Sequence, residues 1–352
     1  MQPDADPLFV INVPVGTDRR QSKVGYIDRR GTTIISPRFD DGLKFSEGLA
    51  AVKLEKKWGF IDRNGEFAIS PAFHTFSRFH EGLARMSAPG RWGVFRRLPV
   101  RTFSSLDKHL GEILRSKRLG FIDRSGKLVV GYEYTMAGDF AEGAAHVQLN
   151  DKFGYIDRSG TLVIPAIYDD ARGFSEGLAA IKLGGAWGYI DSSGVLAIPP
   201  KFRTNDFKAA HAFVEGIGRA PDDQKFGYIN REGEFVIPPE FDIAGPHLDG
   251  LACVELNGHY GFIDESGEFR IAARFDYAND FSEGLAAVRL GERFGFINQE
   301  GEMVIAAKFL GTEDFENGLC YVETEDSVGY IEASGKFVWQ GPYVESRSGS
   351  LR

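Results

Sequence analysis

The residues of this chain that could do chemistry are its seven histidines, its two cysteines and its many carboxylates. No histidine belongs to an HExxH motif or a His–Cys cluster, the spacings that zinc sites use. A nucleophilic thiol would need a local histidine, which the spacing around Cys253 and Cys320 does not supply, so both read as small buried side chains. No GxSxG, P-loop or dinucleotide motif occurs. We expect no catalytic residue, metal or cofactor; an enzyme would need His109 or His211 to meet a carboxylate in a pocket.

Carboxylates recur at two regular positions, and the first series precedes a glycine by three residues. Its members are Asp28, Asp62, Asp123, Asp157, Asp191 and Asp264, with Asn230, Asn298 and Glu332 in the same place. Calcium takes about six to eight oxygen ligands, and one carboxylate per turn supplies too few. Aspartate at the start of a turn that glycine closes is typical of a β-hairpin, so we interpret this series as turn chemistry.

The second carboxylate series directly precedes a glycine and is followed ten residues later by a series of mostly basic side chains. The acids are Glu47, Glu81, Glu142, Glu176, Glu215, Asp249 and Glu283, and the later residues are Lys57, Arg91, Lys152, Ala186, Lys225, His259 and Arg293. We expect the two series to face each other as a ladder of ion pairs. Because exposed ion pairs contribute only about 0.2 to 1 kcal/mol each, the expected role of the ladder is to align neighbouring units. The alternative is an acidic column that binds cations or basic peptides.

The element that positions these side chains is an internal repeat. Nine segments share one motif: VGYIDRRG, WGFIDRNG, LGFIDRSG, FGYIDRSG, WGYIDSSG, FGYINREG, YGFIDESG, FGFINQEG and VGYIEASG, the first starting at residue 24. Their glycines are regularly spaced, as between Gly25 and Gly59, where 59 − 25 = 34. With the degenerate WGVF at Gly93 included, ten units span residues 8–340, and a second marker, FSEGLAAV, recurs in step.

Each unit predicts three short strands. GLAAV and WGFID alternate in the manner of strands, and the β-branched run that ends in proline suits a strand that stops or lies at a sheet edge. Trp58 and Phe60 point to one face, and the intervening Gly59 indicates that a neighbouring backbone or ring comes close. One such β-meander cannot bury a core alone, so consecutive units must stack.

The pattern KWGFID-x-x-G, followed by VIPP-x-F and FSEGLAAV, resembles the WG repeat found in many bacterial proteins. The resemblance covers about residues 8–340 and implies an all-β repeat protein that serves as a binding or interaction module, without catalytic residues. Propellers usually have four to eight blades of four strands. Ten three-stranded units therefore favour an open solenoid or superhelix, with a closed propeller-like ring as the alternative.

The repeat is interrupted at residues 96–118, where the spacing and composition predict a short amphipathic helix near 104–116. Seven basic side chains accompany two acidic ones there: Arg96, Arg97, Arg101, Lys108, Arg115, Lys117 and Arg118 against Asp107 and Glu112. The segment is either a structural plug or a docking element for a partner with an acidic surface; nucleic acid is disfavoured. The fifth unit is extended at 204–213, and we expect mobile tails at 1–7 and 341–352.

Composition sets the remaining expectations. The 352 residues carry a net charge of −9 and are 43% hydrophobic, which excludes general disorder. No run of eighteen apolar residues occurs, and the N-terminus lacks the basic region of a signal peptide, so we expect a cytoplasmic protein with no membrane association. The leading hypothesis is a non-enzymatic scaffold that binds another protein, such as a bacterial inhibitor, immunity or adaptor protein. The rival is a glycan-binding or cell-wall-binding repeat in which Trp58, Trp92 and Trp187 stack on sugars.

Overall fold

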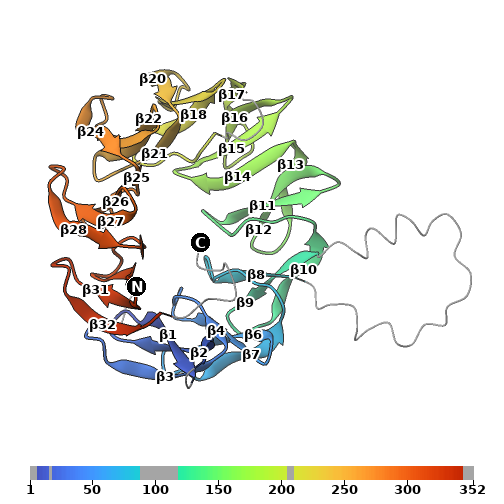
Figure 1. The fold of residues 1–352 in the computed structure, drawn as a ribbon. Coiled ribbons are helices and arrows are strands. Elements are labelled where there is room, and N and C mark those ends of the chain that lie inside the picture. The colour runs from blue at the N-terminus through green and yellow to red at the C-terminus, as the bar shows by residue number, and fades with distance from the viewer. Residues whose placement is uncertain (1–5, 16–17, 88–117, 204–209, 344–352) are drawn as a thin grey trace, which may run out of the picture.

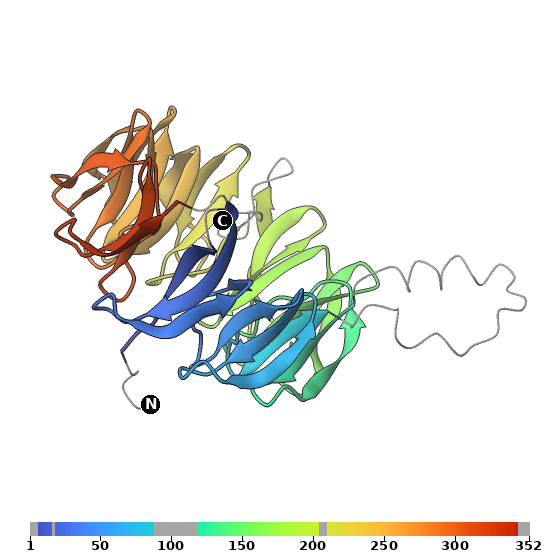
Figure 2. The ribbon, with the colours of Figure 1, turned by 60° about the horizontal axis from the view of Figure 1, so that its bottom comes forward.

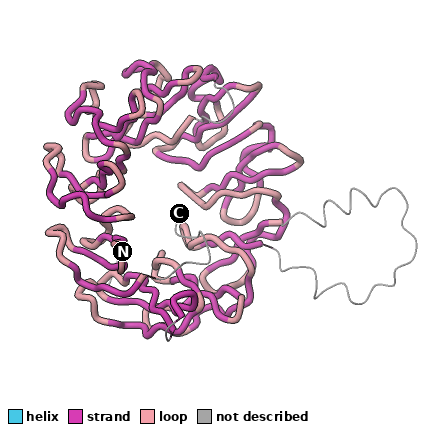
Figure 3. The backbone as a smooth tube through the Cα atoms, viewed as in Figure 1, coloured by secondary structure: helices cyan, strands magenta, loops and turns pink. Residues whose placement is uncertain are grey.

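The computed structural model describes residues 6–15, 18–87, 118–203 and 210–343, and these residues form nine antiparallel sheets around a central opening (Figure 1). Each sheet is one blade of a propeller, and blades follow one another in sequence order, as the tilted view also shows (Figure 2). The described residues contain strands, turns and loops without helix (Figure 3). No helix long and apolar enough to cross a membrane therefore occurs among them.

The strands of each blade are contiguous in sequence. Blade 1 contains β1 (Phe9–Val15), β2 (Asp18–Ile27) and β3 (Thr33–Phe39). Blade 2 contains β4 (Asp41–Gly42), β5 (Ala50–Leu54), β6 (Lys57–Ile61) and β7 (Phe67–Phe73). Blade 3 contains β8 (Leu83–Ser87), β9 (Leu119–Asp123) and β10 (Leu128–Tyr134). Blade 4 contains β11 (Ala144–Leu149), β12 (Lys152–Asp157) and β13 (Leu162–Tyr168). Blade 5 contains β14 (Asp170–Ser175), β15 (Leu178–Leu183), β16 (Ala186–Asp191) and β17 (Leu196–Arg203). Blade 6 contains β18 (Gly218–Asp222), β19 (Lys225–Ile229) and β20 (Phe235–Phe241). Blade 7 contains β21 (Ile243–Leu248), β22 (Leu251–Leu256), β23 (His259–Ile263) and β24 (Phe269–Phe275). Blade 8 contains β25 (Tyr277–Ala278), β26 (Ala286–Leu290), β27 (Arg293–Ile297) and β28 (Met303–Phe309). Blade 9 contains β29 (Gly311–Thr312), β30 (Cys320–Glu323), β31 (Ser327–Ile331) and β32 (Phe337–Pro342).

The expectation of an open solenoid of ten three-stranded units is wrong: the array is a closed propeller of nine blades. The count falls because two repeat units share blade 3, where β8, which ends at Ser87, pairs directly with β9, which begins at Leu119. A short innermost strand also gives five of the blades a fourth strand. The sequence markers define each unit but not the angle between successive sheets, and that angle decides between a ring and a superhelix. The helix expected near 104–116 lies outside the described residues.

Glycine in the WG motif is required by a bulge in the next strand. Between Trp58 and Phe60 the pairing of β6 with β7 shifts, because extra residues of β7 loop out opposite Gly59. A Cβ on Gly59 would lie 2.5 Å from the carbonyl oxygen of Ile69 and 2.7 Å from the nitrogen of Pro71. The predicted close approach of a neighbouring backbone is thus confirmed, and the strand that follows the WG motif, such as β7 with Pro71, is the outermost strand of its blade (Figure 1).

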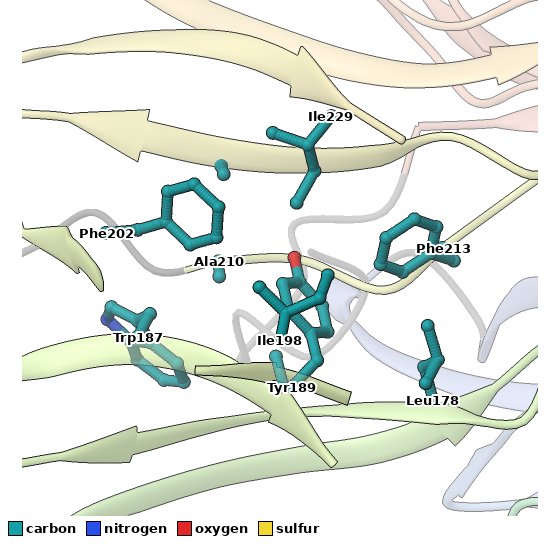
Figure 4. Packing of buried hydrophobic residues seen from close by; sticks show 10 residues of the cluster. Leu178, Trp187, Tyr189, Ile198, Phe202, Ala210, Phe213 and Ile229 are labelled. Carbon is teal, nitrogen blue, oxygen red and sulfur yellow. The ribbon is translucent and has the colours of Figure 1, made fainter. Parts of the chain in front are cut away.

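The hydrophobic core lies between the blades. Between blades 5 and 6, Tyr189 packs on Phe213 of the next blade, and Trp187 belongs to the same buried cluster (Figure 4). At every junction from blade 1 to blade 9, an aromatic ring of the following blade packs on the second aromatic ring of the WG motif, with centroids 4.7 to 5.1 Å apart. The pairs are Phe45–Tyr26, Phe79–Phe60, Phe140–Phe121, Phe174–Tyr155, Phe213–Tyr189, His247–Tyr228, Phe281–Phe262 and Phe315–Phe296.

Ring closure uses a different aromatic residue. Tyr330 of blade 9 packs on Phe9 of blade 1 with centroids 5.3 Å apart, and its hydroxyl donates a 2.8 Å hydrogen bond to the carbonyl of Val10. Phe9 occupies a pairing position that is Ala, Gly or Cys in every other blade, for example Ala50 and Cys320. The ring of Phe9 fills the space that is filled at the other junctions by a ring of the following blade, such as Phe45 or Phe79. Blades 1 and 9 are thus joined by packing and not by an exchanged strand.

The aspartate series forms turns, as predicted. Asp157 Oδ1 accepts hydrogen bonds from the backbone N–H groups of Ser159 and Thr161, and Gly160 closes the turn with positive φ. The glutamate series forms a second hairpin that we did not predict. Glu142 and Gly143 both have positive φ between the bridged residues Ala141 and Ala144, which is the geometry of a type I′ turn.

The glutamates bind the neighbouring blade and not the expected basic series. Glu142 Oε2 accepts a 2.9 Å hydrogen bond from the N–H of Gly177 in blade 5. The same contact links Glu47 to Gly82, Glu81 to Gly143, Glu176 to Gly216 and Glu283 to Gly318. Lys152 pairs instead with Asp169, which directly follows β13, at 2.5 Å. The acidic series therefore aligns adjacent units, but through backbone N–H groups.

Candidate functional site

The inner edge of the ring carries the side chains that differ most between blades. In blades 2 to 9 we call the ring that packs on the preceding blade, such as Phe45 or His247, the inner aromatic residue. The two residues directly before it are the inner-edge pair. The pairs of blades 2 to 9 are Leu43–Lys44, Ser77–Arg78, Gly138–Asp139, Arg172–Gly173, His211–Ala212, Gly245–Pro246, Asn279–Asp280 and Glu313–Asp314. Core positions on either side repeat closely, so a regular frame holds an irregular polar surface.

Charge on this inner edge is unevenly distributed. The inner-edge pairs of blades 2 and 3 contribute the cations Lys44 and Arg78, whereas those of blades 8 and 9 contribute Asp280, Glu313 and Asp314. Blade 1 lies between these two sectors, and among the described residues it has no inner-edge pair, because β1 takes the place of the strand that precedes the WG-motif strand in the other blades. The two oppositely charged sectors therefore meet at the ring closure.

A cavity of about 720 Å³ lies at this meeting point. We call it the closure cavity; it is lined by Val10, Asn12, Leu43, Lys44, Arg78, Asn279, Ser282, Glu313, Asp314, Phe315, Glu316, Tyr321 and Tyr330. Lys44 Nζ reaches across blade 1 and lies 2.9 Å from Glu313 and 2.7 Å from Glu316. Its pKa is raised because these carboxylates outweigh the effect of burial. A smaller cavity of about 220 Å³ adjoins it and shares Lys44, Glu313, Asp314, Glu316, Tyr321 and Tyr330.

Further polar side chains face the next blade from the strand that precedes the WG-motif strand, at a position that is alanine in blades 2, 5 and 8. In blade 3 this residue is Arg85, which donates a hydrogen bond to the carbonyl of Ala137 and lies 3.9 Å from Asp139. The same carboxylate lies 3.6 Å from His80. In blade 6 the residue is Arg219, which donates a 2.8 Å hydrogen bond to the carbonyl of Ala244. These contacts tie the inner segments of successive blades together.

Burial shifts the pKa values of several inner-wall groups. It lowers the pKa of His146 and of His211 to about 4, and nearby arginines act in the same direction. It raises the pKa of Asp280 to about 6 although Arg219 acts in the opposite direction. Both histidines are thus neutral at pH 7. Among the described residues, no three His, Cys, Asp or Glu side chains come together as a metal site requires.

The structure places only part of the sequence-predicted site. Arg96, Arg97, Arg101, Lys108, Arg115, Lys117, Trp92 and His109 lie outside the described residues. Arg118 donates a hydrogen bond to the carbonyl of Glu133 in β10, the outermost strand of blade 3. Arg118, the one described residue of the basic segment, therefore does not line the closure cavity.

Trp58 and Trp187, the two described tryptophans among those proposed for glycan stacking, lie in or near the core. Trp187 is only 2% exposed, and the guanidinium of Arg172 lies 5.0 Å from the centre of its ring. Trp58 is half-buried against Phe76, at 4.5 Å between ring centroids. A buried ring offers no open face to a sugar, so Trp187 is not available for stacking. His211, the other residue in a break of the repeat, lies 5.7 Å from the ring of Phe226.

Sequence reasoning missed the inner-edge pairs and the closure cavity. The pairs stand between two well-repeated markers, and their signal is variation at a fixed position of the repeat. The cavity has no sequence signal, because it joins residues from blades 1, 2, 3, 8 and 9 that only ring closure brings together.

These observations define a nine-bladed β-propeller built from one repeated meander. The WG containing repeat model matches residues 25–58, 58–92, 120–153, 153–185, 187–220, 226–259, 260–293 and 294–326. The chain belongs to this family. A search of curated proteins finds no match.

Solved structures resemble the chain at low sequence identity. A crystal structure of the eukaryotic initiation factor superposes with a TM-score of 0.64 at 11% identity, covering 97% of both chains. AztD of Citrobacter koseri gives a TM-score of 0.44 at 12% identity over 96% of both chains. Hsv2p of Kluyveromyces lactis gives 0.39 at 9% identity over 55% of this chain and 73% of its own. The first of these likenesses supports the fold alone.

Proposed function

We propose that this protein is a non-enzymatic interaction scaffold whose inner edge binds another protein. The observation that carries the proposal is the contrast between a repeated core and inner-edge pairs that differ in charge and size from blade to blade. Interaction surfaces in repeat proteins are formed in this way, by variable positions on a constant frame. WG-repeat membership and the propeller fold are both compatible with a binding module.

The test is affinity capture from a lysate of the source organism at physiological salt, with bound proteins identified by quantitative mass spectrometry. The intact chain is compared with an inner-edge variant that carries Arg78→Ala and Arg172→Ala. The control carries Arg270→Ala and Lys201→Ala, which remove the same charge from the outermost strands β24 and β17. We expect a partner that the intact chain and the control retain and the inner-edge variant loses. Retention by all three, or by none, would contradict an inner-edge interface.

A fourth bait tests the basic interruption. Residues 96–118 are replaced by a short Gly/Ser linker, and folding of every bait is first checked by circular dichroism. Loss of the partner from this bait alone would assign docking to the basic segment and to a partner with an acidic surface. Retention would assign it a structural role.

A further inference from the structure

The closure cavity exists because the ring closes without the inner segment that other junctions have. Elsewhere the tyrosine of the WG motif donates its hydroxyl to an inner-edge carbonyl, as Tyr155 does to Arg172 and Tyr228 does to Gly245. Tyr330 donates to Val10 of β1 instead. The inner-edge pairs of blades 2 and 9 therefore face each other across β1, with the cavity between them. Its volume of about 720 Å³ falls within the range of ligand sites, roughly 300 to 1,000 Å³.

The blade 9 wall of the cavity is built to receive a positive charge. Lys44 is a resident ammonium that already binds two of its carboxylates, those of Glu313 and Glu316. The third carboxylate, Asp314, accepts a 2.7 Å hydrogen bond from the amide of Asn279 and belongs to no ion pair within the described part of the chain. A carboxylate has about four acceptor positions, so Asp314 can bind a further donor.

One partly exposed aromatic ring completes this wall. Tyr321 is half-buried and lines the cavity in front of the buried Tyr330, with ring centroids 5.7 Å apart. Aromatic faces attract ammonium and guanidinium groups, and they also cover the methylene chain of a lysine or arginine. On the opposite side, the exposed Arg78 can donate hydrogen bonds to peptide carbonyl groups. The combination of a carboxylate, an aromatic ring and a guanidinium matches a basic side chain attached to a peptide backbone.

We propose that the closure cavity binds an arginine or lysine side chain of a peptide segment, with its cation at Asp314. This inference rests on the proposed function, because it names the kind of partner segment that the inner edge receives. Lys44 competes with the incoming cation for the same wall, so removal of its charge makes Glu313 and Glu316 available to the ligand.

The test measures binding of fluorescein-labelled Gly-Gly-Arg-Gly-Gly-amide to the full chain by fluorescence anisotropy. The same peptide with citrulline in place of arginine retains the shape without the charge, and spermidine is the small-amine competitor. We expect the citrulline peptide to bind at least tenfold more weakly. Equal binding of the two peptides, no binding at a protein concentration of about 1 mM, or spermidine binding tighter than the peptide would overturn the proposal.

Three variants locate the site. Asp314→Asn should weaken binding of the arginine peptide at least tenfold, and Lys44→Gln should strengthen it severalfold. Asp326→Asn, which makes the same change on the exposed β30–β31 turn of blade 9, should leave binding unchanged. Equal effects of Asp314→Asn and Asp326→Asn, or weaker binding by a folded Lys44→Gln, would contradict the assignment. Lysate capture by the intact chain without arginine-peptide binding would leave the scaffold proposal standing and reject this one.

Discussion

At the residue scale, a single glutamate in each of five blades both forms a turn and binds the next blade. Glu142 adopts φ of 52°, a conformation that non-glycine residues adopt only at a cost, and its side chain binds the next blade. Asparagine or aspartate would fit this turn better, and Asn317 and Asp249 occupy it in blades 9 and 7. The contact between blades accounts for glutamate at the five positions that make it, Glu47, Glu81, Glu142, Glu176 and Glu283.

Replacement of Glu142 by alanine should therefore destabilise the fold by about 1 kcal/mol through loss of a charge-assisted hydrogen bond. Glu215→Ala is the matched control, because Glu215 has φ of 52° and no hydrogen bond to the next blade within the described residues. Urea denaturation of both variants measures the difference. Equal losses of unfolding free energy would show that the turn conformation, and not the contact, matters.

His146 should make stability fall on acidification. Its pKa is lowered from 6.5 to about 4, so the unfolded chain takes up a proton first as the pH decreases. Its contribution to folding is complete above about pH 6.5 and is lost progressively towards pH 4, by at most about 3 kcal/mol.

Denaturation between pH 7 and 4 should show a flatter profile for His146→Asn than for the parent chain. The comparison of variants isolates this group, because Asp280 acts oppositely: its raised pKa favours the folded state as the pH falls below about 6. Parallel profiles for the two proteins would exclude His146 as a source of acid sensitivity.

At the element scale, blade 3 shows that a repeat unit and a blade need not coincide. β8 and β9 pair from Leu83 with Asp123 to Ser87 with Leu119, although thirty-one residues separate the paired ends (119 − 87 − 1 = 31). The sheet hydrogen bonds and the packing of Phe121 on Phe140 are complete without those residues.

Replacement of residues 88–117 by a short glycine-containing turn should therefore preserve the fold and leave the melting temperature within a few degrees, because a shorter loop costs little and closes the same hairpin. Differential scanning calorimetry of the two chains provides the measurement. A drop of more than ten degrees or a second transition would mean that the removed segment contributes to the core.

At the scale of the whole molecule, stability depends on one closure that differs from the other eight junctions. Phe9, 7% exposed, packs on Tyr330 where the other blades have small residues. Phe9→Ala should cost about 3 to 5 kcal/mol through the cavity it leaves.

Hydrogen exchange then tests whether closure is the weak point of the ring. Exchange in β1, β2, β31 and β32 should accelerate more than exchange in blades 4 to 6. Uniform acceleration of exchange around the ring in Phe9→Ala would show that closure is not a separate step.

Tyr330→Phe removes only the hydroxyl contact with Val10 and should lower the free energy of unfolding by about 1 kcal/mol.

The sequence by itself determined the repeat, the strand order within each unit, the aspartate turns and the close approach at Gly59. These features depend on contacts between residues near in sequence, and periodicity records such contacts. Family membership followed from the same repeated residues.

Only the tertiary structure decided closure, the number of blades and the place of the cavity. Whether blade 9 meets blade 1 depends on a small angle summed over all the blades, and no single repeat encodes that sum. The role of Phe9 became visible only against Tyr330, which lies 321 residues away (330 − 9 = 321). The opposed charges of Lys44 and Glu316 likewise become neighbours only because the ring closes across blade 1.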